Sequence, residues 1–186
     1  AQALLRAALA HGVPGVAGPS ANRFGRVSPT RASHVIEEFA GRVPVVDGGA
    51  CAVGIESTIV DATRDRLVVL RPGHFGAEQL SQWAGQMVWG HDQASGPAPR
   101  ASGTLESHYA PRARVRLFTR AELLARGQSP APLKVAVWSP DAPPPGWAGP
   151  WRIQPSDAQA CAHDLYAALR ELDATGVDEL WVAQVP

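Results

Sequence analysis

The sequence predicts an α/β protein built from two units that are joined by a linker. Helix and strand patterns are mixed over residues 1–85, whereas Gly, Pro, Ser and Ala dominate residues 86–113 without a sustained hydrophobic period. From residue 114 onward, strand and helix patterns alternate, as they do in a small parallel α/β domain. Hydrophobic residues make up 45% of the 186 residues, so the chain can bury a real core.

Composition narrows the class of protein. No run of about 18 apolar residues occurs, which predicts no membrane span, and residues 1–10 lack the features of a signal peptide. We therefore expect a cytoplasmic protein. Cys51 and Cys161 lie far apart and form no CxxC motif, so we expect both to be ordinary buried thiols.

Charge is distributed unevenly although the net charge is zero. Up to Arg120 the chain carries 13 arginines and 9 acidic residues, whereas the remainder carries 4 basic and 8 acidic residues. The first part therefore has a net charge of +4 and the second part −4. This asymmetry favours an anionic ligand, a nucleotide or a polynucleotide, on the first part. A random scatter of charge on a neutral protein is the alternative.

The first unit is expected to mix helices with short strands. Helical patterns cover residues 1–12, 28–41 and 77–84; Gly12 would end the first helix, and Ser28, Pro29 and Thr30 would begin the second. Strand patterns cover residues 13–18, 43–49, 54–63 and 65–73, and the last two are expected to pair. The chain starts inside a helical pattern without a methionine and stops just after a strand-like run, so we expect it to be a fragment.

The second unit is expected to alternate strands and helices. Strand patterns cover residues 114–119, 133–140 and 178–185, and helical patterns cover residues 120–127 and 157–176. Leu165, Ala168, Leu169 and Leu172 would form the inward face of the longer helix. No motif in this unit indicates what it binds.

Small polar side chains crowd the loop that follows the first predicted strand. Ser20 and Asn22 are two residues apart, and a hydroxyl and an amide can donate hydrogen bonds to phosphate or carboxylate oxygens. Gly18 would let a ligand approach the backbone closely. Ser28 would sit at a helix N-terminus, which favours anions. The alternative is that Ser20 and Asn22 only form a turn and Ser28 only caps its helix.

Polar residues also interrupt the apolar strand pattern of GIESTIVD at residues 54–61. Alternation along a strand would place Ser57 on one face and Glu56 on the other, so that Ser57 can contact a substrate. Arg71 ends the next strand, where its planar guanidinium can bind phosphate. The alternatives are a serine that bonds a neighbouring strand or water, and an arginine paired with Asp61 or Glu56.

Six motifs resemble, in order and spacing, the YrdC-type threonylcarbamoyl-AMP synthases in the long form that carries a C-terminal domain. They are PSAN at 19–22, SPT at 28–30, DGG at 47–49, GIESTIVD at 54–61, RPG at 71–73 and HYAP at 108–111. The resemblance implies an α/β fold in three parts. A partial YrdC-like domain with a mixed twisted sheet spans residues 1–85, a linker or lid spans 86–113, and a small Rossmann-like parallel α/β domain, itself incomplete, spans 114–186.

The resemblance also implies a reaction and a set of site residues. Such enzymes make L-threonylcarbamoyladenylate from L-threonine, bicarbonate and ATP, with magnesium, and release pyrophosphate; the product serves tRNA modification. Possible partners are tRNA and tRNA-modification proteins, and no membrane is involved. ATP would be bound by Ser20, Asn22, Ser28, Arg71 and Tyr109, and threonine by Gly18 and Ser57. No residue is assigned as catalytic or as a metal ligand.

The chain departs from the family pattern in two places. A lysine and arginine pair, with a threonine and a tyrosine of the substrate cleft, would lie upstream of Ala1, so the 186 residues alone are expected to have negligible activity. Residues 101–105 replace a proline-containing segment before His108 and Tyr109, which weakens the assignment of a lid.

Two other functions stay open at this point. One is a non-catalytic module that binds tRNA, which the arginine excess favours and the lack of interleaved aromatic residues disfavours. The other is the YrdC-like part of a carbamoyltransferase that matures hydrogenases. The HYAP segment and the α/β unit that follows it argue against this second context.

Overall fold

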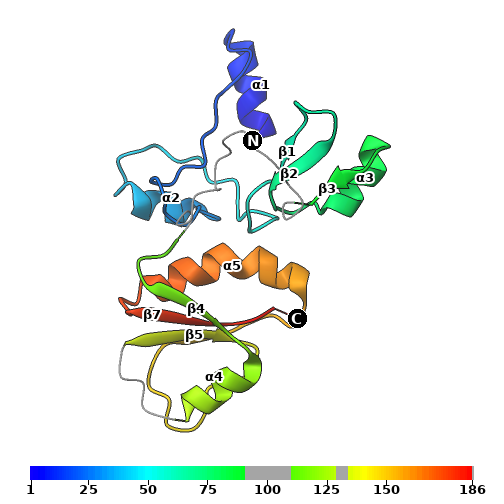
Figure 1. The fold of residues 1–186 in the computed structure, drawn as a ribbon. Helices are drawn as coiled ribbons and strands as arrows, with labels where there is room; N and C mark the ends of the chain where they lie inside the picture. The colour runs from blue at the N-terminus through cyan, green and yellow to red at the C-terminus, as the bar shows by residue number, and fades with distance from the viewer. Residues whose placement is uncertain (91–109, 129–133, 186) are drawn as a thin grey trace.

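The computed structural model describes residues 1–90, 110–128 and 134–185 (Figure 1). The described strands form two sheets, one of three strands in the order β1-β2-β3 and one of four strands in the order β4-β7-β5-β6. The first belongs to the N-terminal unit and the second to the C-terminal unit, as the sequence predicts. None of the described helices is long and apolar enough to cross a membrane.

The N-terminal unit contains the expected paired strands and two of its helices as predicted. Strand β1 (Ile59–Asp61) runs antiparallel to β2 (Leu67–Arg71), with Val60 opposite Val69. Helix α1 (Gln2–Ala10) ends before Gly12, whose φ of 77° is in the left-handed region, and α3 (Ala77–Ala84) has the predicted bounds. Strand β3 (Val88–Trp89) pairs in parallel with β2, so this sheet extends into the segment interpreted as a linker.

Two strands that the sequence predicts in this unit do not form, so these predictions are wrong. Residues 13–18 and 43–49 are irregular, and Val16 and Val46 are 55% and 77% exposed. Their valines favour extended structure, but a strand also needs a partner to satisfy its backbone groups. Neither segment is hydrogen-bonded into a sheet of the described residues. Local propensity alone therefore misled the prediction here.

The second predicted helix starts later than its sequence signal indicates. Helix α2 (Ala32–Glu38) has Arg31 as its N-cap, and no side chain caps it. Ser28 and Thr30 therefore lie outside the helix, in an extended segment that carries an isolated bridge between Arg26 and Ala110. Cys51 is exposed, contrary to prediction, whereas Cys161 is buried as predicted.

The C-terminal unit is a parallel sheet with one helix on each face. Its strands are β4 (Arg114–Phe118), β5 (Val135–Ser139), β6 (Trp151–Ile153) and β7 (Glu179–Ala183), and its helices are α4 (Arg120–Gly127) and α5 (Ala158–Asp173). All its strand pairs are parallel. Only β6 was not predicted, because a three-residue strand among prolines carries little pattern.

Alternation along the central strands builds two cores. Ala136 and Trp138 of β5 pack toward α5, with Ala168, Leu169 and Leu172 among their partners, as the helical pattern predicts. Val135 and Val137 pack on the opposite face with Leu123 of α4 and Trp181 of β7. Both faces of the central strands are therefore buried, which explains their nearly continuous apolar sequences.

Helix α5 lies between the two units (Figure 1). One side of it covers the C-terminal sheet. Val27, which belongs to the N-terminal unit, joins the same core cluster and is 3% exposed. The two units are therefore joined by packing as well as by the chain between them.

Candidate functional site

Arg71 stands at the end of β2 and holds the GIEST segment. Its Nε and Nη2 donate to the carbonyl oxygen of Ser57 at 3.0 and 2.8 Å, and Nη2 also donates to Ser57 Oγ at 3.0 Å. Arg71 is buried, being only 9% exposed. Hydrogen bonds from a charged group contribute about 1.5–3 kcal/mol each to stability, so this fork fixes where Ser57 lies.

Glu56 links the segment around Ser28 to Arg71. Its Oε1 accepts a hydrogen bond from Ser28 Oγ, and its Oε2 lies 3.7 Å from Arg71 Nη2. Ser28, Glu56, Ser57 and Arg71 therefore form one connected group, which we call the Glu56 cluster. The ion pair between Arg71 and Glu56, which the sequence offers as the alternative to phosphate binding, occurs in this cluster, and so does the expected proximity of Ser57 to Arg71.

Ser57 and Ser28 do not owe their positions to the features that the sequence predicted, which were strand alternation for Ser57 and a helix N-terminus for Ser28. Ser57 precedes β1 and is not part of a strand, so strand alternation does not explain its exposed position. Ser28 is not at a helix N-terminus, because α2 begins at Ala32. The helix dipole therefore gives Ser28 no special affinity for anions. The Ser28 hydroxyl bonds a carboxylate instead, at 7% exposure.

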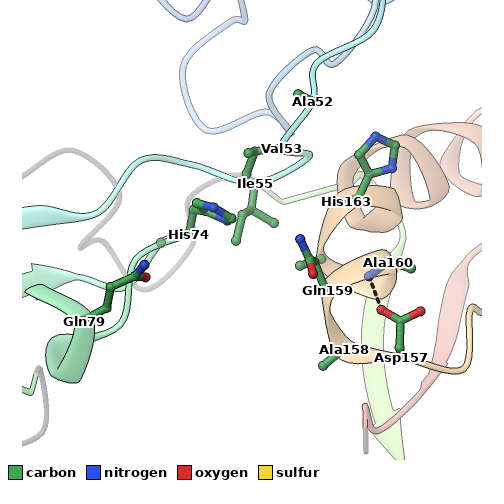
Figure 2. Close-up of a pocket in the computed structure, with 12 residues that line it drawn as sticks. Ala52, Val53, Ile55, His74, Gln79, Asp157, Ala158, Gln159, Ala160 and His163 are labelled. Carbon is green, nitrogen blue, oxygen red and sulfur yellow. Dashed lines mark hydrogen bonds between the residues drawn. The ribbon is translucent and has the colours of Figure 1, made fainter.

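Two adjoining cavities lie between this cluster and α5. One of about 370 Å³ is lined by Glu56 and Arg71 together with Leu165 and Tyr166 of α5. The second, of about 750 Å³, shares Ile55 and Gly73 with the first. Figure 2 shows Ile55 and His74 on one wall of the larger cavity and Gln159 and His163 of α5 on the other. The C-terminal unit therefore contributes directly to the walls beside Arg71.

Asn22 closes its own loop and leaves one polar atom unpaired. Its Nδ2 donates to the carbonyl oxygen of Arg26 at 2.8 Å, whereas its Oδ1 is buried and has no hydrogen-bond partner among the residues that the structure describes. The preceding Ala21 has a φ of 54°, and a non-glycine residue in the left-handed region costs about 1–3 kcal/mol. The turn interpretation describes the contacts of Asn22, but a buried acceptor without a donor is itself unusual.

The remaining predicted site residues are not part of the Glu56 cluster. Gly18 and Ser20 are exposed, and a Cβ atom added at Gly18 would meet nothing within 4 Å. Packing among the described residues therefore does not require a glycine at this position. Tyr109 lies outside the described residues.

Sequence reasoning missed the contribution of α5 to this region. Arg170 donates from Nε and Nη2 to the carbonyl oxygen of Val27 at 3.0 and 2.5 Å, and Asp173 accepts from the backbone N–H of Arg112 and Ala113. The available signal was a second helical stripe at positions 163, 166, 167, 170 and 173, beside the inward face that the pattern identified. A helix face that mixes polar and apolar residues usually faces solvent, so the pattern alone does not predict that this face forms contacts.

Within residues 1–90, 110–128 and 134–185, no group of three or more His, Cys, Asp or Glu side chains could hold a metal ion. Glu56, the acidic member of the cluster, already accepts from Ser28 and lies near Arg71.

Two known protein families match this chain, one over its N-terminal part and the other over the rest. Residues 75–186 match the family described as "Threonylcarbamoyl-AMP synthase, C-terminal domain". The chain belongs to this family. Residues 1–73 match a second family, described as "Telomere recombination". The resemblance drawn from the motifs is thereby confirmed for both parts of the chain.

Curated relatives carry the same family name. The threonylcarbamoyl-AMP synthase of Schizosaccharomyces pombe is 32% identical over 196 residues, which cover 91% of this chain and 48% of the relative. That of Pyrococcus abyssi is 34% identical over 181 residues, which cover 88% of this chain and 50% of the relative. This synthase-family chain therefore spans about half the length of the curated relatives it matches.

Solved structures show the same fold. The crystal structure of P. abyssi Sua5 complexed with L-threonine matches with a TM-score of 0.74 at 32% identity, over 90% of this chain and 52% of that chain. A structure of the same protein with a histidine and the tyrosine after it both replaced by alanine matches with a TM-score of 0.72 at 30% identity, over 90% and 51%. The predicted two-unit α/β fold is thus confirmed for this member of the synthase family.

Proposed function

We propose that the protein makes L-threonylcarbamoyladenylate from L-threonine, bicarbonate and ATP, with release of pyrophosphate, for tRNA modification. The observation that carries this proposal is the Glu56 cluster, in which segments with the SPT, GIEST and RPG motifs meet through side-chain contacts. The names of the relatives support it, as does the L-threonine complex of the P. abyssi protein.

The proposed reaction depends on placement rather than on a strong nucleophile. The threonine amine forms a carbamate either by adding to CO₂ with loss of a proton or by reacting with bicarbonate with loss of water. A carbamate oxygen then attacks the α-phosphorus while the bond to pyrophosphate breaks. Both substrates carry negative charge, so they must be held together against their repulsion. The guanidinium of Arg71, beside an exposed Ser57 hydroxyl, supplies a fixed positive charge where this is needed.

Individual roles are inferred from the resemblance, and the contacts of Ser57 and Arg71 support two of them. In this proposal, Ser57 binds threonine through a hydroxyl that Arg71 keeps in position. The backbone at Gly18 also binds threonine, and Ser28 and Arg71 bind the ATP phosphates. Ser20 and Asn22 complete the ATP site. Because the unpaired atom of Asn22 is an acceptor, it suits a donor such as a ribose hydroxyl better than a phosphate oxygen.

Tyr109 is proposed to cover the nucleotide as part of a lid within residues 86–113, in the part of that segment that follows β3. This chain has a single histidine followed directly by a tyrosine, His108 and Tyr109. A histidine and the tyrosine after it are also the residues replaced in one solved structure of the P. abyssi protein. That parallel supports the assignment, although both residues lie outside the described part of this chain.

Magnesium is proposed to enter with the nucleotide rather than to reside in the protein. Mg²⁺ in nucleotide sites is commonly held by substrate phosphates, water and one or two carboxylates. This fits a site whose described residues offer no group of three ligands. The cytoplasmic location and the tRNA-modification partners remain predictions.

Pyrophosphate release from ATP by the full-length protein tests the proposal. The expected result is release that requires both L-threonine and bicarbonate and stops when either is omitted. Release that ignores both substrates would overturn it. Salt-sensitive tRNA binding without any turnover would instead favour the non-catalytic module, since phosphate contacts weaken steeply as salt rises.

A further inference from the structure

Arg170 connects the C-terminal unit to the segment that carries Ser28. Besides its two bonds to the Val27 carbonyl oxygen, its Nε lies 3.4 Å from the carbonyl oxygen of Ser28. Its Nη2 also donates to Glu38 Oε2 at 2.9 Å, and the side chains of both partners are largely buried, at 12% and 6% exposure. One guanidinium thus joins α5, α2 and the backbone at residues 27–28.

The Val27 carbonyl belongs to the same peptide unit as the Ser28 N–H. A trans peptide is planar, and its C=O and N–H point in opposite directions. By holding the carbonyl toward α5, Arg170 turns the Ser28 N–H away from α5 and fixes the backbone from which the Ser28 side chain extends. The Ser28 hydroxyl then meets Glu56 of the Glu56 cluster.

Other contacts hold α5 against the same region. Asp173 pairs with Arg26 at 3.6 Å, one helical turn beyond Arg170. At the other end of the interface, a Cβ atom added to Gly54 would lie 1.6 Å from the carbonyl oxygen of His163. The helix backbone therefore touches the GIEST segment directly. Two segments of the proposed site, around Ser28 and around Gly54, both rest on α5.

We propose that Arg170 is a positioning residue, through which the C-terminal unit sets the orientation of the Ser28 segment for ATP binding. This inference rests on the proposed function. It gives the C-terminal unit a task in forming the nucleotide site that the sequence alone does not reveal. Arg170 acts through the backbone of residues 27–28 and is not itself a contact of the substrate.

The electrostatics of the contact agree with a fixed arrangement. Burial alone would raise the pKa of Glu38, but the hydrogen bond and positive charge of Arg170 outweigh it and the pKa is lowered. Glu38 is therefore ionised at neutral pH and keeps a charged partner for Arg170. A lysine at position 170 would keep the charge but lose the planar fork that spans two partners.

Arg170→Ala in the full-length protein tests this inference, with Arg152→Ala as the matched control. Arg152 also forms ion pairs with α5, at Asp164 and Glu171, but lies in β6 within the C-terminal unit. We expect Arg170→Ala to raise the KM for ATP about tenfold or more and the KM for threonine less than about threefold. Arg152→Ala should change both values by less than about twofold.

ATP binding measured by calorimetry without threonine separates the two proposals. If the wild-type protein binds ATP but shows no threonine-dependent turnover, the proposed function fails and the ATP affinities of the two variants still decide the role of Arg170. Equal ATP affinities for Arg170→Ala and Arg152→Ala would overturn the inference. A wild-type protein that binds no ATP would overturn both.

Arg170→Lys keeps the inference falsifiable if the alanine variant does not fold. Circular dichroism establishes folding of each variant before binding is measured. The lysine variant should bind ATP more weakly than the wild type, because an ammonium group can bond the Val27 carbonyl but cannot bridge two partners in a fixed fork. Wild-type ATP affinity in Arg170→Lys would contradict the need for that fork.

Discussion

Gly54→Ala is the substitution whose effect the structure specifies most closely. An added Cβ would lie 1.6 Å from the carbonyl oxygen of His163, 2.4 Å from its carbonyl carbon and 2.8 Å from its Cα. All three obstacles are backbone atoms of α5, so no side chain can rotate away. To reach even 3.0 Å, below which Cβ contacts essentially do not occur, α5 and the GIEST segment must separate by about 1.4 Å.

The loss of stability in Gly54→Ala is large because the backbone of α5 cannot easily move aside. Overpacking typically destabilises a protein by about 1–3 kcal/mol, and a buried clash with helix backbone belongs at the upper end, near 3 kcal/mol. A gain of about 0.4–1 kcal/mol from the less flexible unfolded chain offsets part of it. We therefore expect a net loss of about 2 kcal/mol in the free energy of unfolding. Threonine-dependent turnover should fall as well, because Glu56 and Ser57 lie only two and three residues after Gly54.

Urea denaturation followed by tryptophan fluorescence measures the loss, with Gly15→Ala as the control. A Cβ at Gly15 meets nothing within 4 Å, and this residue lies in an exposed, irregular segment. The control should therefore be neutral or slightly more stable than the wild type. If Gly54→Ala unfolds at the same urea concentration as Gly15→Ala, α5 does not rest on the GIEST segment and the reasoning is wrong.

Three further predictions concern the residues around the site. Ser57→Ala should raise the KM for threonine about two- to tenfold and leave the KM for ATP unchanged in steady-state kinetics, because only one hydroxyl is lost; an equal rise in both would contradict a threonine-specific role. Arg71→Lys should raise both KM values although the charge is kept, because the fork that holds the Ser57 carbonyl is lost; wild-type kinetics would show that charge alone suffices. The pKa of Glu38 is lowered in the folded state, so the unfolded state binds more protons and the free energy of unfolding falls as the pH drops through and below the ordinary glutamate value of 4.5. In urea denaturation at these pH values, the free energy of unfolding of Glu38→Gln should fall less steeply than that of the wild type. An unchanged slope would contradict the ion pair between Glu38 and Arg170.

Most of the C-terminal unit could be predicted because its signals are local. The helix beginning at Arg120 has a capping box between Thr119 and Glu122, and the apolar runs at residues 135–139 and 179–183 are strands buried on both faces. Such features depend on neighbouring residues, so a pattern reveals them. The irregular segments around Val16 and Val46 show the opposite case, in which local propensity lacks a partner strand.

The connections of the site could not be predicted because they join distant parts of the chain. Motifs identified Ser28, Ser57 and Arg71 one by one, but no pattern indicates that Glu56 accepts from Ser28. The bond from Arg170 to Val27 spans 143 residues and involves a backbone carbonyl, which has no residue type to recognise. Side chain to backbone contacts of this kind become visible only when the fold places the two segments together.

The most direct test of the central claim is a crystal structure of the full-length protein with L-threonine and a non-hydrolysable ATP analogue. The account predicts both ligands in one pocket, with the threonine within hydrogen-bond distance of Ser57 and the phosphates beside Arg71 and the Ser28 segment. Ligands bound in separate places, or a nucleotide that contacts neither Arg71 nor residues 28–30, would contradict it.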